Sequence, residues 1–287
     1  MSDGDGGGGE SARVADVLRA RMADGSYPLN SLLPPQRHLA EELGVSRDTV
    51  QRVLRELRAE GWIETRQGMG TRVVRAQHIH SLANDRHPEG TVTLRSVIDR
   101  AFGRREVTLD VFTLTCESLD AHLRLQIERI RAGEISPQRI TLRVLSPAQS
   151  LSLPYWRTPD LADDELLRER LLAMTEHHVA SVKSVLRDLE AQQLVPSVDL
   201  EIRRVSMVPH FKLYLLNGAE AVLGHYMLYM RNVVLEDGRE IERVLDVSGA
   251  GVGLAHHVTD ENPNSQGTVF VNSFQEWFDA VWEHLTD

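Results

Sequence analysis

The sequence predicts a multidomain α+β protein, with a small helix-turn-helix followed by a hairpin, and then a larger α/β layered domain with a mixed sheet. Two observations support this. Residues 33–74 follow the order helix, tight turn, helix and two short strands. From Val107 onward, stretches of alternating polarity are interspersed with stretches of helical apolar spacing, as in helices that cover a sheet. The chain of 287 residues is long enough for both domains.

The smaller domain is predicted over residues 11–75, after a Gly- and Asp-rich tail, residues 1–10, that is expected to be disordered. Residues 11–23 have the apolar spacing of a first helix. Pro34 and Pro35 open a second helix, where a missing N–H costs nothing, and Gly44 ends it. Ser46 is well suited to cap the third helix. The order predicts two helices joined by a tight turn.

The third helix has one apolar face and a polar first turn. Val50, Val53, Leu54 and Leu57 fall at the spacing of one buried face. The first turn is expected to present Arg47, Asp48, Thr49 and Gln51 to solvent, which is typical of a recognition helix in the major groove. Strands are predicted at 62–65 and 71–74, so the hairpin around 67–70 would form a wing.

This segment resembles the winged helix-turn-helix of the GntR family of bacterial transcription regulators. The resemblance covers Ser11 to Arg75. The residues that carry it are Leu33-Pro34-Pro35-Gln36-Arg37, Leu39-Ala40, Leu43-Gly44-Val45-Ser46-Arg47, Thr49-Val50, Leu54, Leu57, Glu60-Gly61 and Gln67-Gly68-Met69-Gly70-Thr71. Asn30 and Pro35 depart from the Gly and Ser that the family often has, and neither is on the presumed DNA-facing surface.

The resemblance implies sequence-specific DNA binding. Arg37 and Arg47 would contact base edges in the major groove, and the wing would reach the minor groove. The DNA-binding residues expected by resemblance are Arg37, Ser46, Arg47, Thr49, Gln51, Arg66, Gln67, Gly68 and Thr71. The alternative is that these arginines form a solvated basic face.

Charge is unevenly distributed along the chain. The formal net charge is -10, yet residues 11–75 contain 11 arginines and 8 acidic residues, a net charge of +3. A mildly basic domain joined to an acidic remainder of the same chain is compatible with DNA binding through one face of the basic domain. The single cysteine, Cys116, fits a reducing cytoplasm, and no apolar stretch approaches the roughly 20 residues that span a bilayer. We therefore expect a cytoplasmic protein.

Residues 76–93 are polar and are predicted to be an interdomain linker. His78, His80 and His87 could form a metal site, but no carboxylate or cysteine lies at ligand spacing, so a linker is favoured. Residues 94–287, called the body below, are predicted to be an α/β domain that binds effector and dimerises. Its predicted helices are 94–102, 119–130, 163–192 and 274–285, and its predicted strands are 107–115, 140–145, 198–205, 211–216, 221–230 and 239–247.

Two further features of the body are interpreted as structural and not as ligand sites. The glycine-rich segment 248–253 follows a strand without a convincing helix after it, so a flexible loop is favoured over a dinucleotide site. The aromatic residues Tyr155, Trp156, Trp277 and Trp282 are more often core or interface than a ligand cage.

One group of residues in the body resembles a known functional motif. His210-Phe211-Lys212, then Asn217 and Gly224, resembles the HKD motif of the phospholipase D superfamily, HxKx4D followed by six residues and GSxN. The predicted order of strands and helices also fits one repeat of that phospholipase D-like fold. Because i and i+2 share a face of a strand, His210 and Lys212 are expected to point into one pocket, where they could hold an anion.

The departures from the motif argue against catalysis. Asn217 replaces the aspartate, His225 and Met227 stand at the Ser and Asn positions, and one copy is present where that superfamily needs two. We therefore expect no enzyme activity but a phosphate- or anion-binding effector site. Its candidate residues are His210, Lys212, Asn217 and His225. Alternatively, these are ordinary strand residues.

The sequence thus predicts a homodimeric, ligand-responsive regulator that binds an inverted repeat in double-stranded operator DNA. Repression is implied by the resemblance only. The effector is expected to be a small molecule, phosphorylated or otherwise anionic, and no cofactor, metal or membrane partner is expected. The alternatives are a DNA-tethered phosphodiesterase or nuclease, a regulator whose body only dimerises, and a body with the sugar-effector fold common in the family.

Overall fold

The computed structural model describes most of the chain. The residues that it leaves undescribed are 1–10, 12, 13, 16, 20, 23–26, 28–30, 60, 61, 67–69, 74–77, 82–92, 160, 236–238, 250–252 and 287. The predicted tail and part of the predicted linker therefore lie outside the described residues. Within the described part, no helix is both long and apolar enough to cross a membrane.

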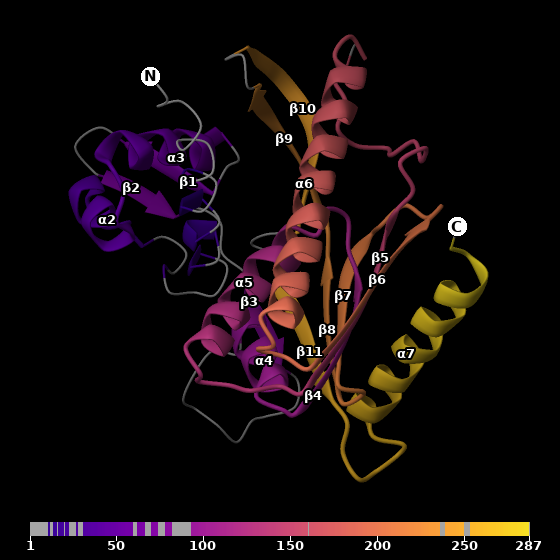
Figure 1. Ribbon diagram of the computed structural model, residues 1–287. Helices are drawn as coiled ribbons and strands as arrows, with labels where there is room; N and C mark the ends of the chain where they lie inside the picture. The colour runs from indigo at the N-terminus through magenta and orange to yellow at the C-terminus, as the bar shows by residue number, and fades with distance from the viewer. Residues whose placement is uncertain are drawn as a thin grey trace.

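The amino-terminal domain has the predicted helix-turn-helix and wing (Figure 1). The described residues between 11 and 22 are helical. They are followed by α2 (Gln36–Leu43), α3 (Arg47–Ala59), β1 (Ile63–Arg66) and β2 (Gly70–Val73). The two strands are antiparallel, and Leu32 bridges to Arg72 on the outer side of β2. A separate core encloses residues from every helix and both strands, which makes this a domain of its own.

The turn between α2 and α3 forms for the reasons that the sequence indicated. Gly44 ends α2 in the left-handed conformation, with φ of 67°, which glycine adopts without strain. Ser46 Oγ then accepts the Thr49 N–H at 3.0 Å and caps α3. Pro35 lies at the N-cap of α2 rather than inside its first turn.

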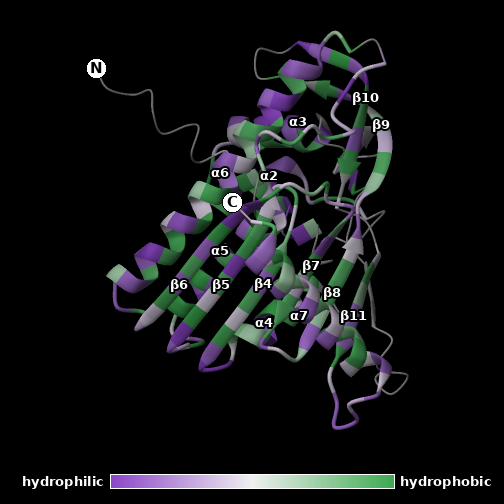
Figure 2. Cartoon of the chain, turned by 90° about the vertical axis from the view of Figure 1, so that its right-hand side faces the viewer, coloured by the Kyte–Doolittle hydropathy of each residue, from purple (hydrophilic) through white to green (hydrophobic). Residues whose placement is uncertain are grey.

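The body is built on a seven-stranded mixed sheet in the order β3-β11-β8-β7-β4-β5-β6. Figure 2, seen from the α7 side, shows six of these strands from left to right, in the order β6, β5, β4, β7, β8 and β11. The strands are β3 (His78–Ser81), β4 (Glu106–Phe112), β5 (Arg139–Pro147), β6 (Ser197–Val205), β7 (Phe211–Leu216), β8 (Glu220–His225) and β11 (Gly253–Val258). β4, β5 and β6 are parallel, so their carboxyl ends meet at one edge, and β7 runs antiparallel to β4.

Helices cover both faces of this sheet, as Figure 1 shows. One face packs against α4 (Leu94–Phe102), α5 (Glu117–Arg131) and α6 (Asp164–Ala191), around a large apolar core. The other packs against α7 (Gln266–His284), through residues such as Phe278 and Trp282. The predicted α/β layered domain with a mixed sheet is therefore confirmed.

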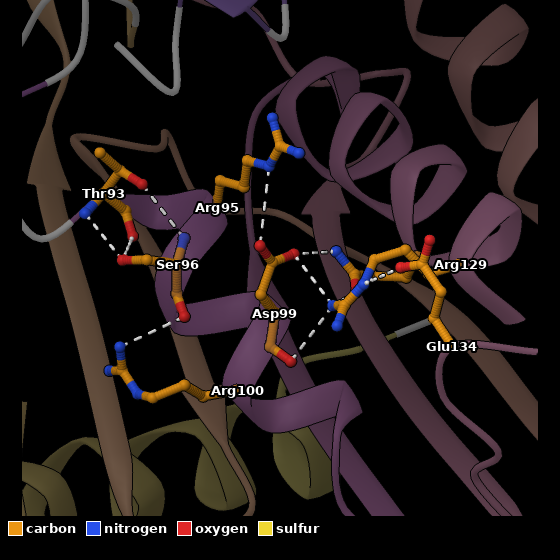
Figure 3. A network of polar contacts seen from close by, with 8 residues as sticks. Thr93, Arg95, Ser96, Asp99, Arg100, Arg129 and Glu134 are labelled. Atoms are coloured by element: carbon orange, nitrogen blue, oxygen red, sulfur yellow. Dashed lines mark hydrogen bonds and ion pairs between the residues drawn. The ribbon is translucent and has the colours of Figure 1, made fainter. Parts of the chain in front are cut away.

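Polar contacts fix α4 against α5 (Figure 3). Thr93 and Ser96 form a reciprocal capping box at the start of α4. Near the end of α4, the Asp99 carboxylate accepts a hydrogen bond from Gln126 at 2.5 Å and lies 3.3 Å from the Arg129 guanidinium. These contacts hold the first helix of the body in register with the second.

A two-stranded arm of β9 (Met227–Val234) and β10 (Glu240–Ser248) extends beyond the sheet (Figure 1). It packs against the loop 148–163 and the first half of α6, in a third apolar cluster of the body. Arg157 bridges to Leu245 of β10, so the loop is tied to the arm by main-chain hydrogen bonds.

Four sequence predictions in this part of the chain need correction. Residues 78–81, predicted as linker, form β3 and pair with β11. Residues 221–230, predicted as one strand, are β8 and β9, separated at Tyr226. Residues 253–258 form β11, which was not predicted, and α7 begins at Gln266 rather than at 274. β3 and β11 are stabilised by pairing with strands that are distant in sequence. The pattern of polar and apolar residues within each segment does not reveal such pairing.

Candidate nucleic-acid interface and ligand site

The first turn of α3 forms a polar surface. Arg47, Asp48 and Gln51 are exposed, whereas Val50, Val53, Leu54 and Leu57 are buried beneath them. Arg37 on α2 is also exposed, and its Nε donates to Glu41 at 3.0 Å. Such an exposed pair is weak and can exchange for a contact to DNA. The helix is therefore held by its apolar face while its amino-terminal end stays accessible.

Thr49 was predicted to be exposed to solvent, but only 4% of its surface is exposed. Its hydroxyl lies 2.9 Å from Ser46 Oγ, and its main-chain N–H donates to the same oxygen. Thr49 lies four residues before Val53 and so shares the buried face of α3. The prediction that it presents its side chain to solvent was wrong; it is part of the helix cap.

The wing is described only in part. Arg66 pairs with Gly70 at the end of the hairpin nearest the turn. Gln67 and Gly68 lie outside the described residues, as does the side chain of Arg66. Thr71 is half-buried, with its hydroxyl 3.2 Å from that of Thr65, and its carbonyl accepts the Leu33 N–H. The backbone of the wing is thus held by both Thr65 and the segment before α2.

An arginine links the two domains. The Arg19 guanidinium lies 2.5 Å from the Glu56 carboxylate of α3 and 3.5 Å from that of Glu117, at the start of α5. The side chain of Arg19 is 10% exposed, so both contacts are largely shielded from solvent. α3 also lies beside β9 of the arm. A change at the start of α5 therefore has a direct route to the recognition helix.

Lys212 is buried within the body, not open to a pocket with His210. Its exposure is 2%, and its ammonium donates to the Gly249 carbonyl at 2.7 Å. Burial lowers the pKa of Lys212 to about 7, and the nearby Glu117 charge opposes this only in part. A side chain on Gly249 would collide with the Tyr226 ring at 2.8 Å. The glycine is what allows this carbonyl to approach the lysine.

The other three residues of the HKD-like motif lie elsewhere. His210 is exposed and precedes β7, so it does not share a strand face with Lys212. His225 pairs with Phe211 and therefore lies on the sheet face opposite Lys212. The prediction that these residues converge on one pocket was wrong, because Lys212 is buried, His210 is exposed and His225 lies on the other face of the sheet.

Asn217 is a turn residue at the far end of β7. Asn217 and Gly218 have φ of 53° and 62°, and the Ala219 N–H donates to the Leu216 carbonyl, as in a type I′ turn. The Asn217 side chain accepts the Thr108 N–H at 2.8 Å and donates to the Ala101 carbonyl at 3.3 Å. The dipeptide Asn-Gly between two apolar runs is the sequence signal that could have identified it as a hairpin turn.

Replacing Asn217 with Ala should therefore destabilise the fold by about 1–3 kcal/mol, because it removes two hydrogen bonds and because alanine adopts the left-handed region less readily than asparagine. Urea unfolding measures the loss. Asn217→Gly is the matched control: it keeps the backbone freedom and isolates the hydrogen bonds, so it should lose less. Equal stability of the Ala variant and the wild type would contradict the structural role.

A pocket that the sequence did not indicate lies at the carboxyl edge of the parallel strands. Its walls come from the ends of β4, β5 and β6, from the loop 148–163 and from the first half of α6. The aromatic residues of that loop, Tyr155 and Trp156, are buried and belong to it. The available signal was a Pro- and aromatic-containing loop after a parallel strand, the place where α/β sheets bind ligands.

Comparison with known proteins concerns mainly the amino-terminal domain. Residues 10–73 match the model of the bacterial regulatory proteins of the gntR family. The histidine utilization repressor of Pseudomonas putida is 31% identical over 127 residues, which is 43% of this chain and 46% of that protein. The Exu regulon transcriptional regulator of Escherichia coli (strain K12) is 36% identical over 77 residues, 27% of this chain and 30% of that protein.

A third relative, the probable rhizopine catabolism regulatory protein MocR of Rhizobium meliloti, is 39% identical over 89 residues, 31% of this chain and 16% of that protein. The matched region thus spans less than half the length of each of these relatives. The family match and the observed helix-turn-helix with its wing agree on the same residues. The amino-terminal domain of this chain is therefore a GntR-family helix-turn-helix domain of the transcription-regulator type.

Proposed function

We propose that the protein is a cytoplasmic transcription regulator that binds an inverted repeat in operator DNA as a homodimer and responds to a small anionic effector. The observation that carries this is the exposed polar first turn of α3, on a helix whose other face is buried and whose start is capped by Ser46. Repression is supported by relatives whose names include a repressor of histidine utilization.

In this proposal Arg37, Arg47 and Gln51 contact base edges, and Ser46 lies next to the DNA at the start of α3. These side chains are exposed on neighbouring helices. Arg66, Gln67, Gly68 and Thr71 of the wing remain predicted contacts to the minor groove. Selection of DNA from a random-sequence pool tests the proposal: an enriched inverted repeat is expected. A pool without any enriched sequence would reject the function.

The homodimer is supported by apolar side chains on the arm. Met227, Leu228 and Met230 of β9 are 58%, 59% and 51% exposed. Grouped apolar exposure of this kind is typical of association surfaces, and a twofold dimer would present two recognition helices to two half-sites. We therefore propose that the dimer interface includes β9 of each copy.

Sedimentation velocity should give one species at about twice the chain mass of 32.3 kDa at micromolar concentration. Leu228→Lys should shift it to the monomer, because a charge in the centre of the interface must be desolvated. The matched control is Val269→Lys on α7, where the native residue is 47% exposed, and it should remain a dimer. A dimeric Leu228→Lys protein would place the interface elsewhere.

The response to effector is supported by the contacts between the domains. The segment after β4 leads from Leu114, in the wall of the pocket, to Glu117, which contacts Arg19. Arg19 in turn contacts Glu56 on the recognition helix. A ligand that displaces this segment would change how the two α3 helices are held, and so the affinity for two half-sites at fixed spacing.

The phospholipase D-like origin of the body stays a prediction, supported by the order of its first strands and helices. A phosphodiesterase is not favoured, because the Lys212 ammonium binds a main-chain carbonyl and the His210 side chain is not on the same strand. The body nonetheless offers another place for an anion.

A further inference from the structure

The pocket at the carboxyl edge of β4, β5 and β6 has a cavity volume of about 80 Å³ and is partly open to solvent, so a small ligand can enter it. Most of its wall is apolar, with Leu114, Leu151, Leu153, Leu171 and Leu172 among the lining residues. A pocket of this kind binds a hydrocarbon body and orients it by a few polar groups.

One of those polar groups has no partner within the described part of the chain. Trp156 lines the pocket and is 7% exposed, yet its indole Nε1 has no hydrogen-bond partner among the described residues. Its backbone has φ of 62°, which is unfavourable for a residue with a Cβ, and its main-chain N–H is fixed by the Leu245 carbonyl at 2.7 Å. Buried N–H groups are normally satisfied, and strained backbone is frequent at ligand sites, so both features suit a ligand oxygen here.

The charged residues in the wall are Arg168, Glu176 and Arg204. Arg204 is paired with Glu176 at 2.8 Å, and it also donates to Ser146 Oγ and the Pro147 carbonyl. That pair is internally neutral. Arg168 binds Glu165 instead, on the exposed side of α6, where half of the guanidinium side chain is open to solvent. An exposed pair is worth little, so Arg168 can turn to a ligand carboxylate at small cost.

We propose that this pocket is the effector site and that it binds a small hydrophobic monocarboxylate, aromatic or branched. One carboxylate oxygen accepts the indole N–H of Trp156, Arg168 pairs with the carboxylate, and the hydrocarbon body packs on the leucines. This inference rests on the proposed function, since it names the site and ligand class of the same regulator. The anion site is thus assigned to the carboxyl edge of the parallel strands and not to the HKD-like motif.

Calorimetric titration of the full-length protein with benzoate and with isovalerate tests the site. At least one should bind, benzamide should bind more weakly because it lacks the charge, and inorganic phosphate should not bind. Trp156→Phe keeps an aromatic ring but removes the donor, and it should weaken binding by roughly ten- to a hundredfold. Trp277→Phe, on the opposite face of the sheet, is its control and should bind like the wild type.

Two further variants separate the contacts. Arg168→Gln should lower the affinity for the carboxylate but not for benzamide, whereas Arg187→Gln, an exposed arginine later on α6, should change neither. Leu172→Trp fills the pocket and should abolish binding, and it gives a second test if Trp156→Phe does not fold. If neither carboxylate binds, or if Trp156→Phe and Leu172→Trp both bind like the wild type, the assignment is overturned.

Failure of this inference can be told apart from failure of the proposed function. The same variants are titrated with the operator obtained by random-pool selection. Operator binding without carboxylate binding overturns the effector site and leaves the regulator intact. Carboxylate binding that releases the operator from the wild type, but not from Leu172→Trp, supports both. Carboxylate binding by a protein that enriches no DNA sequence keeps the pocket and rejects the regulator.

Discussion

Replacing Arg47 with Ala should weaken specific operator binding by roughly 30- to 25,000-fold. Arg47 is exposed in the first turn of α3, where recognition helices contact base edges. A bidentate contact between arginine and guanine is worth about 1–3 kcal/mol, and a dimer loses it in both half-sites. The loss across the operator is therefore about 2–6 kcal/mol.

The fold should be unchanged by this substitution, because an exposed side chain without a buried partner rarely contributes more than about 0.5 kcal/mol to stability. A mobility-shift titration at fixed salt measures the loss, with unrelated DNA as a reference for the nonspecific term. Arg58→Ala is the matched control: it removes the same charge from the exposed face of the last turn of α3 and should cost much less affinity. An Arg47→Ala protein with the affinity of the wild type would exclude Arg47 from base recognition.

Replacing Lys212 with Met should stabilise the protein at pH 6 by about 2–4 kcal/mol. The pKa of Lys212 falls from 10.5 in the unfolded chain to about 7 in the folded protein, because burial disfavours the charged form. A tenfold change in the protonation equilibrium corresponds to roughly 1.4 kcal/mol, and loss of the donor to the Gly249 carbonyl offsets about 1–3 kcal/mol of the gain.

The sign of the pH dependence follows from the depressed pKa. Between about pH 7 and pH 10.5 the unfolded chain binds a proton at Lys212 that the folded protein does not, so wild-type stability rises with pH across this window. The advantage of Lys212→Met should therefore be full below pH 7 and vanish near about pH 9. Beyond that pH the wild type should be the more stable, since it alone keeps the hydrogen bond from Lys212 to the Gly249 carbonyl.

Urea unfolding at pH 6, 8 and 10 measures both quantities. The chain contains one other lysine, Lys183, which is exposed on α6, so Lys183→Met is the natural control and should give curves parallel to the wild type. Parallel curves for Lys212→Met as well would show that the buried ammonium carries no desolvation cost. A loss of stability at pH 6 would show that a charged partner holds the lysine.

The amino-terminal domain could be predicted almost entirely from the sequence. Its helices are short-range structures, so the proline pair, Gly44, the Ser46 cap and the apolar face of Val50, Val53, Leu54 and Leu57 each act within a few residues. The exception is Thr49, where residue type suggested a DNA contact and the helical phase placed it in the buried face. Residue type alone does not determine which face of a helix a side chain occupies.

The body was predictable only at the level of its layers. Local periodicity gave α5, α6 and the parallel strands, since these elements bury continuous apolar faces. Local periodicity did not predict β3 or β11. These strands are stabilised because they pair with each other and because β11 also pairs with β8. Local periodicity also joined β8 to β9, because both have strand-like composition and the break at Tyr226 depends on contacts with Thr113 and Leu114.

The candidate ligand site shows the same division. Sequence spacing placed His210, Lys212, Asn217 and His225 in one motif, but the start of β7, the Asn217 turn and the register with β8 separate them. The pocket instead joins the ends of three strands, one loop and one helix, which lie up to 90 residues apart and share no motif. The sequence by itself determined the short-range DNA-binding domain and the layer order of the body. Only the tertiary structure decided which polar groups meet, because long-range strand pairing sets those distances.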